Sequence, residues 1–244
     1  MSAKYRLETI PVWEALSRGS ECLLCELEAE SERRNTEFFL GSSVMAPEVR
    51  VELNKHGFCP RHFHMLQAGT GKLGYALALA THIDDLLKRF SARGKRLIAA
   101  GNRRQAAAKA SADLVDMLLA QDADCLMCDR IRHNLANYAY TIVKLFGTDG
   151  EFRQAFASSR GICLHHLPLV LKLGVVQLKP GEIKRWHDTV VKLVQDGLSR
   201  LGEELEQFTW QFDHNTGRAT PETSQDSVAR AVVRLAGYGP QRLP

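Results

Sequence analysis

Apolar residues recur at intervals of three and four positions along most of the chain, which is the pattern of amphipathic helices. Two long stretches show it most clearly, residues 73–90 and residues 183–208. The recurring apolar positions are Leu79, Ile83, Leu86, Leu87 and Phe90, then Ile183, Trp186, Val190, Leu193, Val194, Leu201, Leu205 and Phe208. No convincing pair of alternating strands joined by a turn is found, so the pattern predicts an all-α fold.

Proline and glycine positions agree with this pattern. Pro47 and Pro180 stand where the first turn of a helix tolerates proline, and Gly57 and Gly161 stand where a helix is expected to end.

A cysteine pattern occurs twice along the chain. A CxxC motif at residues 22–25 is followed by a CxxH motif at 59–62, and the same pair recurs at 125–128 and 163–166. The two CxxC motifs match at an offset of 103, and the CxxH motifs, with the glycine that precedes each, match at 104. We interpret this as an internally duplicated helical bundle. Each copy is expected to hold a CxxC helix, a second helix, a short CxxH helix and a long helix.

The duplication suggests three segments. Residues 1–110 form the first repeat with a basic junction, residues 111–212 the second repeat, and residues 213–244 a polar linker and a short tail helix. The linker covers 213–225. The tail helix is expected to dock on the body or on a partner through one apolar face, which comprises Val228, Ala231, Val232 and Leu235.

All six cysteines belong to the repeated motifs, which predicts metal ligands. Residues i and i+3 project from one face of a helix, so each motif presents two ligands to one point. The repeat selects His62 and His166, since the nearby His64 and His165 have no matching histidine. Two four-coordinate sites are expected, one pinning each half. Their ligands are Cys22, Cys25, Cys59 and His62 in the first half and Cys125, Cys128, Cys163 and His166 in the second.

Zinc is the metal that such closed Cys3His sets favour, with two ions per chain. An iron–sulfur cluster is the main alternative, because thiolates with one histidine can also hold one. Thiol redox chemistry or a disulfide is a further alternative, although a redox CxxC would favour a βαβ setting. A closed site leaves no open position for water or substrate, so these metals are expected to hold helices together.

Charge and hydrophobicity restrict the possible classes of protein only slightly. The formal charge is +4, and the N-terminal residues show no apolar signal-peptide region. No run of 18 apolar residues exists, so no membrane span is expected and the cytoplasm, where thiols stay reduced, is the predicted compartment. Residues 86–112 hold eight basic residues and no acid, which could contact nucleic acid but is more typical of a solvated helix end.

Other candidate positions carry weaker signals. His82 and His187 match each other at an offset of 105 and are expected to be surface or core histidines, with a role beside the metals as the alternative. The acidic run from Glu26 to Glu32 is expected to be a solvated face. No GxGxxG, Walker, HExxH or GxSxG motif occurs, so no enzyme is indicated.

Several stretches together resemble a known bacterial family: TIPVWEAL, ECLLCELE, FFLGSSVMAPEVRVELNKHGFCPRHF and the later CxxC/CxxH pair. The chain resembles a domain of unknown function over nearly its whole length, most specifically in the first half, and the linker HNTGRATPETS departs from it. The resemblance implies no established activity. The residues themselves favour a non-enzymatic zinc-binding protein that binds another protein as an adaptor. The alternative is a redox protein whose two metal sites are its active centres, and a nucleic-acid-associated regulator is a third hypothesis.

Overall fold

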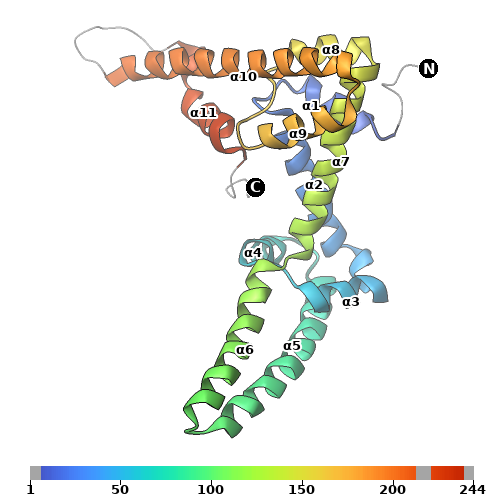
Figure 1. Ribbon diagram of the computed structural model, residues 1–244, viewed down its shortest axis with the longest axis vertical. Helices are drawn as coiled ribbons and strands as arrows, with labels where there is room; N and C mark the ends of the chain where they lie inside the picture. Colours follow the sequence, from blue (N-terminus) through green and yellow to red (C-terminus); the bar gives the residue numbers. More distant parts are fainter. Residues whose placement is uncertain (1–6, 213–220, 239–244) are drawn as a thin grey trace. The chain divides into compact units, whose positions relative to one another are not determined.

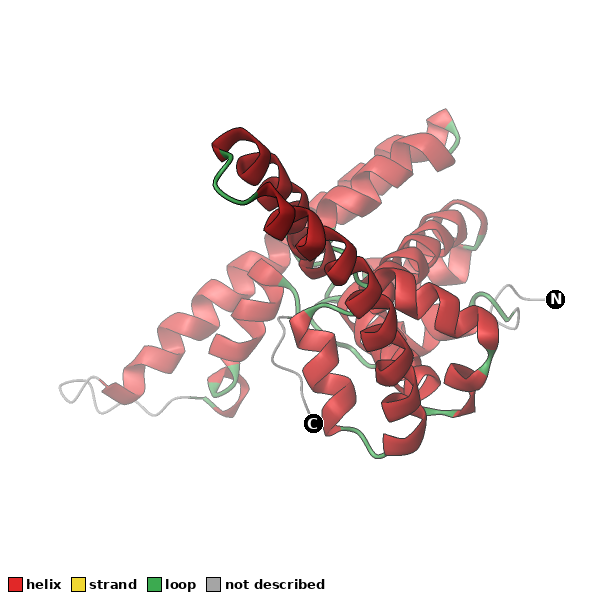
Figure 2. Cartoon of the chain, turned by 90° about the horizontal axis from the view of Figure 1, so that it is seen from below, coloured by secondary structure: helices red, strands yellow, loops and turns green. Residues whose placement is uncertain are grey.

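The described residues, 7–212 and 221–238 of the computed structural model, are helical and contain no strand (Figures 1 and 2). The predicted all-α fold is therefore confirmed. The N-terminal residues 1–6 and residues 213–220 of the expected linker lie outside the described residues. The α-helices are α1 (Ile10–Ser17), α2 (Leu23–Leu40), α3 (Pro47–His56), α4 (Pro60–Ala68), α5 (Lys72–Ala100), α6 (Arg104–Ala123), α7 (Leu126–Thr148), α8 (Gly150–Ala157), α9 (Leu167–Gln177), α10 (Pro180–Thr209) and α11 (Ser227–Ala236). Three short 3₁₀ helices add to these: η2 (Ser42–Met45), η3 (Trp210–Phe212) and η4 (Glu222–Ser224).

The chain forms two compact units. Unit 1 combines residues 1–31 with 133–244, and unit 2 comprises residues 32–132. The unit boundaries fall inside α2 and α7, so both helices contribute to both units. These units divide the chain at other points than the sequence repeat, whose expected boundaries at residues 110 and 212 stay a prediction.

Three of the four helix boundaries predicted from proline and glycine are confirmed, but α8 ends at Ala157, four residues before Gly161, so the predicted helix end at Gly161 is wrong. Pro47 and Pro180 occupy the first positions of α3 and α10. Gly57 ends α3 with a φ of 66°, and Gly161 has a φ of 85° after α8. Both values lie in the left-handed region, which a glycine adopts without steric cost because it has no Cβ atom.

The core of unit 1 is built around Trp186 of α10, whose side chain is fully buried. Its ring stacks on Phe156 at 5.5 Å and meets Phe146 edge-on at 4.9 Å. Its indole nitrogen donates a hydrogen bond to the carbonyl of Val170 on α9. Gly174 permits this packing, because a Cβ atom there would lie 2.3 Å from the indole ring. Aromatic packing of this kind fixes the crossing of α9 and α10.

The core of unit 2 lies beneath the turn that precedes α4. Phe58 meets Phe39 of α2 and Phe63 of α4 edge-on, at 5.1 and 5.5 Å. The guanidinium of Arg130 on α7 lies 4.2 Å from the centre of the Phe38 ring, a cation–π contact. Helices α5 and α6 continue from this core as an antiparallel hairpin joined by a short turn at 101–103 (Figure 1).

The tail helix α11 docks on unit 1, but through a different face from the one expected. Arg234 is fully buried, and Ala231 is 9% exposed. Val228, Val232 and Leu235 are about half exposed, so the apolar docking face predicted from the sequence is wrong except at Ala231. Arg234 sets the orientation of α11, because its guanidinium contacts a carboxylate and two carbonyl groups inside unit 1.

Across the described residues, no helix combines the length and hydrophobicity needed to cross a bilayer.

Candidate metal clusters

The eight predicted ligands gather in two groups, but each group combines residues from both repeats. Cluster A comprises Cys22, Cys25, Cys163 and His166, and cluster B comprises Cys59, His62, Cys125 and Cys128. In each cluster the four ligand atoms lie within 4.8 Å of one another. The expected grouping within each half is therefore wrong: each CxxC motif meets the CxxH motif of the other repeat.

Helix lengths explain this exchange. The first CxxC motif lies at the start of α2, whose 18 residues place its two ends about 27 Å apart. Helix α3 has only ten residues, or about 15 Å, so it covers little more than half of that length before the first CxxH motif begins. The first CxxH motif lies instead beside the second CxxC motif, at the start of α7. The 23 residues of α7 separate that motif from the second CxxH in the same way.

Cluster A is fully buried in unit 1, with His166 only 3% exposed. The Nδ1 atom of His166 lies 3.6 Å from the sulfur of Cys22, 3.5 Å from that of Cys25 and 3.4 Å from that of Cys163. The sulfurs of Cys25 and Cys163 are 3.7 Å apart. All three thiols thus converge with one imidazole nitrogen on a single point.

Cluster B repeats this arrangement in unit 2. The Nδ1 atom of His62 lies 3.3 Å from each of the sulfurs of Cys59, Cys125 and Cys128. The sulfurs of Cys59 and Cys128 are 3.9 Å apart. Cys59 and Cys128 are half-buried, so this cluster is closer to solvent than cluster A.

The backbone around the two clusters is also equivalent. The amide of Leu23, the first residue of α2, donates a hydrogen bond to the carbonyl of Gly161. The amide of Leu126, the first residue of α7, donates to the carbonyl of Gly57. Each bond satisfies an amide that a helix N-terminus leaves without an intrahelical partner. In both clusters it ties the CxxC helix to the glycine two residues before the CxxH cysteine.

Two glutamates of α2 contact the outer nitrogens of the histidines, although their run was expected to be a solvated face. Glu32 Oε1 lies 3.0 Å from Nε2 of His62 and is held by Arg61 at 2.6 Å. Glu28 Oε2 lies 3.4 Å from Nε2 of His166. The hydrogen bond between Glu32 and His62 favours the tautomer of His62 that leaves Nδ1 free to bind a metal, whereas Glu28 is close enough only for a charge contact with His166. For these two residues the expectation is wrong.

Protonation in the clusters is strongly shifted. Burial lowers the pKa of His62, but its contacts with Cys125 and Glu32 outweigh burial and raise the pKa to about 9. Hydrogen bonds from Cys128 and His62 lower the pKa of Cys125 to about 3, against the effect of burial. The pKa of His166 is likewise raised to about 11 despite its burial. Thiolate charge is therefore stabilised beside each imidazole, and a divalent cation would replace the protons held there.

A buried ion-pair network lies next to cluster A. Glu21, adjacent to Cys22 in the chain, is 4% exposed and contacts Arg160 at 2.7 Å, Arg200 at 2.7 Å and Arg234 at 3.0 Å. Burial raises the pKa of Glu21, but Arg200, Arg234 and Arg160 outweigh it and lower the pKa.

Arg234 links the tail helix to the second CxxH loop. Its guanidinium donates hydrogen bonds to the carbonyls of Ile162 at 3.0 Å and Arg160 at 2.6 Å. Its own carbonyl accepts a hydrogen bond from the amide of Leu164. Helix α11 therefore holds the loop that carries Cys163. This role was not predictable from the sequence, because an arginine in an amphipathic helix is usually exposed.

The matched histidines His82 and His187 differ in their surroundings. His82 is buried, and a Cβ atom on Gly57 would lie 3.0 Å from its ring. At Gly161 the corresponding contact is made by Leu193, whereas His187 is half-buried on α10. Burial is the main cause that lowers the pKa of His82, which favours the neutral form of its ring. His82 therefore packs behind the cluster B loop as a core residue.

The basic run at 86–112 spans the end of α5, the turn and the start of α6. It therefore lies inside unit 2, whereas its expected place at the junction between the two sequence repeats stays a prediction. Part of its charge is balanced: Arg89 contacts Asp85 at 2.7 Å, and Arg96 contacts Asp113 at 2.7 Å.

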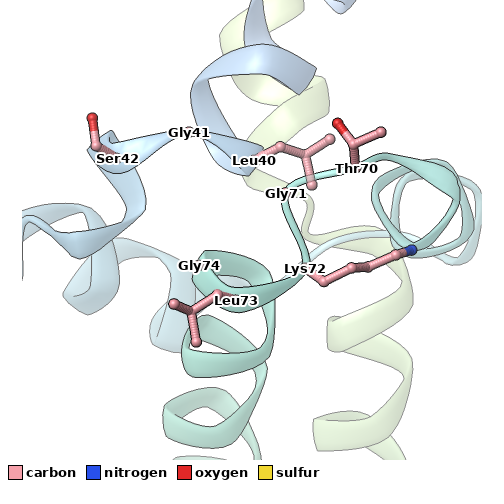
Figure 3. Close-up of a pocket in the computed structure, with 8 residues that line it drawn as sticks. All are labelled: Leu40, Gly41, Ser42, Thr70, Gly71, Lys72, Leu73 and Gly74. Carbon is pink, nitrogen blue, oxygen red and sulfur yellow. The ribbon is translucent and has the colours of Figure 1, made fainter.

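A surface hollow of about 480 Å³ lies in unit 2 between the end of α2 and the start of α5 (Figure 3). Three of its eight lining residues are glycines, and a Cβ atom on Gly71 would lie 2.1 Å from the carbonyl oxygen of Leu40. The side chain of Lys72 donates to the carbonyl of Gln67 on α4. The lining carries no pair of side chains suited to acid–base or nucleophilic chemistry.

The fold and the two clusters define an all-α protein with two Cys3His groups that could each hold a metal ion. A family model described as a family of unknown function (DUF6062) matches residues 3–242, and the chain belongs to this family. The resemblance expected from the sequence is thus confirmed. Neither the curated proteins nor the solved structures contain a match to this chain.

Proposed function

We propose that the protein is a non-enzymatic zinc protein in which one structural zinc ion holds each unit together, and that the resulting helical scaffold binds another protein. The ligand spacing supports this most directly. A tetrahedral zinc with bonds of about 2.3 Å to sulfur and about 2.0–2.1 Å to nitrogen separates two sulfurs by about 3.8 Å and a sulfur from the nitrogen by about 3.5 Å. One sulfur pair in each cluster, Cys25–Cys163 and Cys59–Cys128, is 3.7 and 3.9 Å apart, and the sulfur–nitrogen distances are 3.3–3.6 Å.

The same spacing disfavours the alternatives. An iron–sulfur cluster distributes its ligands over two or more irons, so some ligand atoms must lie farther apart than the edges of a single tetrahedron. In each of the two clusters, the four ligand atoms lie within 4.8 Å of one another. A disulfide needs a sulfur–sulfur distance of about 2.05 Å, and all six cysteines are free.

A site with four protein ligands leaves no position for water or substrate, which favours a structural role over catalysis. Each zinc would join segments far apart in sequence, since Cys25 and Cys163 are separated by 138 residues. The carboxylates of Glu28 and Glu32 would orient the two imidazoles. Exposed helical faces then remain for a partner protein. Reduced thiols are consistent with a cytoplasmic location.

Metal analysis tests this proposal. The untagged protein, purified without oxygen, is expected to carry two zinc ions and to be colourless. Replacement of zinc by Co²⁺ should give the intense visible bands of tetrahedral thiolate coordination. Iron with acid-labile sulfide, and a visible band that bleaches on reduction, would instead establish the redox alternative.

A further inference from the structure

The hairpin of α5 and α6 exposes an unusually large apolar surface. On α5, six large apolar residues are between 36% and 81% exposed: Leu73, Leu77, Ile83, Leu87, Phe90 and Ile98. At 100° per residue, all six fall within an arc of about 140°, so they form one stripe along the helix. On α6, three more are between 43% and 62% exposed: Val115, Leu118 and Leu119.

Both stripes lie on the same face of the hairpin. The ion pairs from Arg93 and Arg96 to Asp113 connect the two helices and mark one face. On each helix, the exposed apolar residues are turned roughly 160° away from these charged residues. Because the ion-paired residues share one face, the two apolar stripes share the opposite one. We name this opposite face the apolar face.

The apolar face is large enough for a stable protein interface. The exposed fractions of its nine side chains amount to about five whole residues, on the order of 800–900 Å². A standard interface buries about 800 Å² on each partner. Two helices alone form a single layer, which can bury only one of its faces. Pairing two hairpins face to face would complete a four-helix bundle.

Charge on the stripe points to an identical partner. Asp84 and Lys95 lie within the arc of the α5 stripe, and neither forms an ion pair among the described residues, whereas the adjacent Asp85 pairs with Arg89. If two α5 helices pair antiparallel about a point between residues 89 and 90, residue 84 of one copy faces residue 95 of the other. Both positions lie about 8 Å from that point along the helix. A twofold axis would thus create two identical Asp84–Lys95 ion pairs.

We propose that the α5–α6 hairpin binds the same hairpin of a second copy of this chain. The two copies form an antiparallel four-helix bundle with Leu87 and Phe90 at its centre. This rests on the proposed role as a binding protein and names the partner for one of its exposed faces.

Sedimentation equilibrium on the full, metal-loaded chain tests the proposal. The wild type is expected to sediment at twice the chain mass of 27.3 kDa at micromolar concentrations. The double variant L87D/F90D should sediment as a monomer with unchanged helix content and metal content. Val176→Asp is the matched control, because Val176 is 75% exposed on α9, and this variant should remain a dimer.

Charge reversal tests the register without altering the apolar face. Asp84→Lys alone and Lys95→Asp alone each place like charges opposite one another twice, so each should weaken the dimer at least tenfold. An equimolar mixture of the two variants pairs unlike charges at both contacts and should restore dimers, as should the double variant D84K/K95D.

A monomeric wild type at about 100 µM, or a mixture that does not recover dimers, would overturn the proposal. Zinc analysis of the same samples separates the two proposals. A monomer with two zinc ions contradicts only the dimer, whereas a dimer that lacks zinc contradicts only the structural metal role.

Discussion

The exchange of motifs between the two repeats makes a sharp prediction about metal stoichiometry. Cys22 and Cys163 belong to one cluster, whereas Cys22 and Cys59 belong to different clusters. The double variant C22A/C163A should therefore bind one zinc ion tightly, and C22A/C59A should bind none. If each half held its own metal, the two results would be reversed.

The energetic consequence can be estimated. A structural Cys/His zinc site contributes about 10–16 kcal/mol of apparent binding free energy, compared with about 5–15 kcal/mol for the whole stability of a typical domain. Loss of cluster A should therefore unfold much of unit 1 and leave unit 2 folded.

Native mass spectrometry after washing with a chelator gives the number of bound ions. Hydrogen exchange gives the location of the damage. In C22A/C163A, exchange should accelerate in α8–α11 while α3–α6 remain protected. The retention of one tightly bound ion by C22A/C59A would refute the exchanged pairing.

Three further predictions follow from residues around the clusters. Glu32→Gln should weaken metal binding by cluster B about 10- to 100-fold and leave cluster A unchanged, as measured by competition with a chromogenic chelator. Because the pKa of Glu21 is lowered, its stabilising contribution is complete above its ordinary pKa of 4.5 and is lost as the pH falls below that value. The free energy of unfolding of Glu21→Gln, measured by urea titration, should therefore fall less between neutral and acidic pH than that of the wild type. Gly197→Ala would place a Cβ atom 2.6 Å from the guanidinium of Arg234 and should cost about 1–3 kcal/mol in urea unfolding. Gly202→Ala on the same helix meets open space and should be neutral or stabilising by up to about 1 kcal/mol, and equal losses at both positions would contradict the packing of Arg234.

Local chemistry was predictable from the sequence. Spacing of apolar residues predicted the long helices α5 and α10, and Gly57 and Pro180 predicted two of the boundaries. Spacing of three residues predicted that each CxxC or CxxH motif acts as one ligand pair, since this depends only on helix geometry.

The choice of partner for each motif was not predictable in the same way. It depends on the length and direction of α2 and α7, because these helices determine the position in space at which the next motif begins. The sequence repeat itself favoured the wrong pairing, because similarity between two segments does not show which of them are in contact.

The sequence carries one signal for the contacts that these glutamates make with the histidines. Glu28 and Glu32 follow Cys25 at three and seven positions, which places all three on one face of α2. An acidic run on a helix is usually solvated, and only the positions of His62 and His166 distinguish these two carboxylates from their neighbours. For α11, the apolar residues suggested the docking face, but the buried carboxylate of Glu21 made Arg234 the better residue to bury.

The exchanged pairing also sets an order for assembly during synthesis. Cluster B is nested inside cluster A along the chain, because its ligands all lie between residues 25 and 163. During synthesis, all ligands of cluster B are available once residue 128 has left the ribosome. The ligands of cluster A, which include Cys22 and Cys25, are complete only after residue 166 has emerged. Formation of cluster B joins Cys59 to Cys128 and shortens the loop that cluster A has to close, which reduces its entropic cost. The first cysteines to be made are thus the last to be used, and a chain interrupted before residue 163 would leave them as two exposed, reactive thiols.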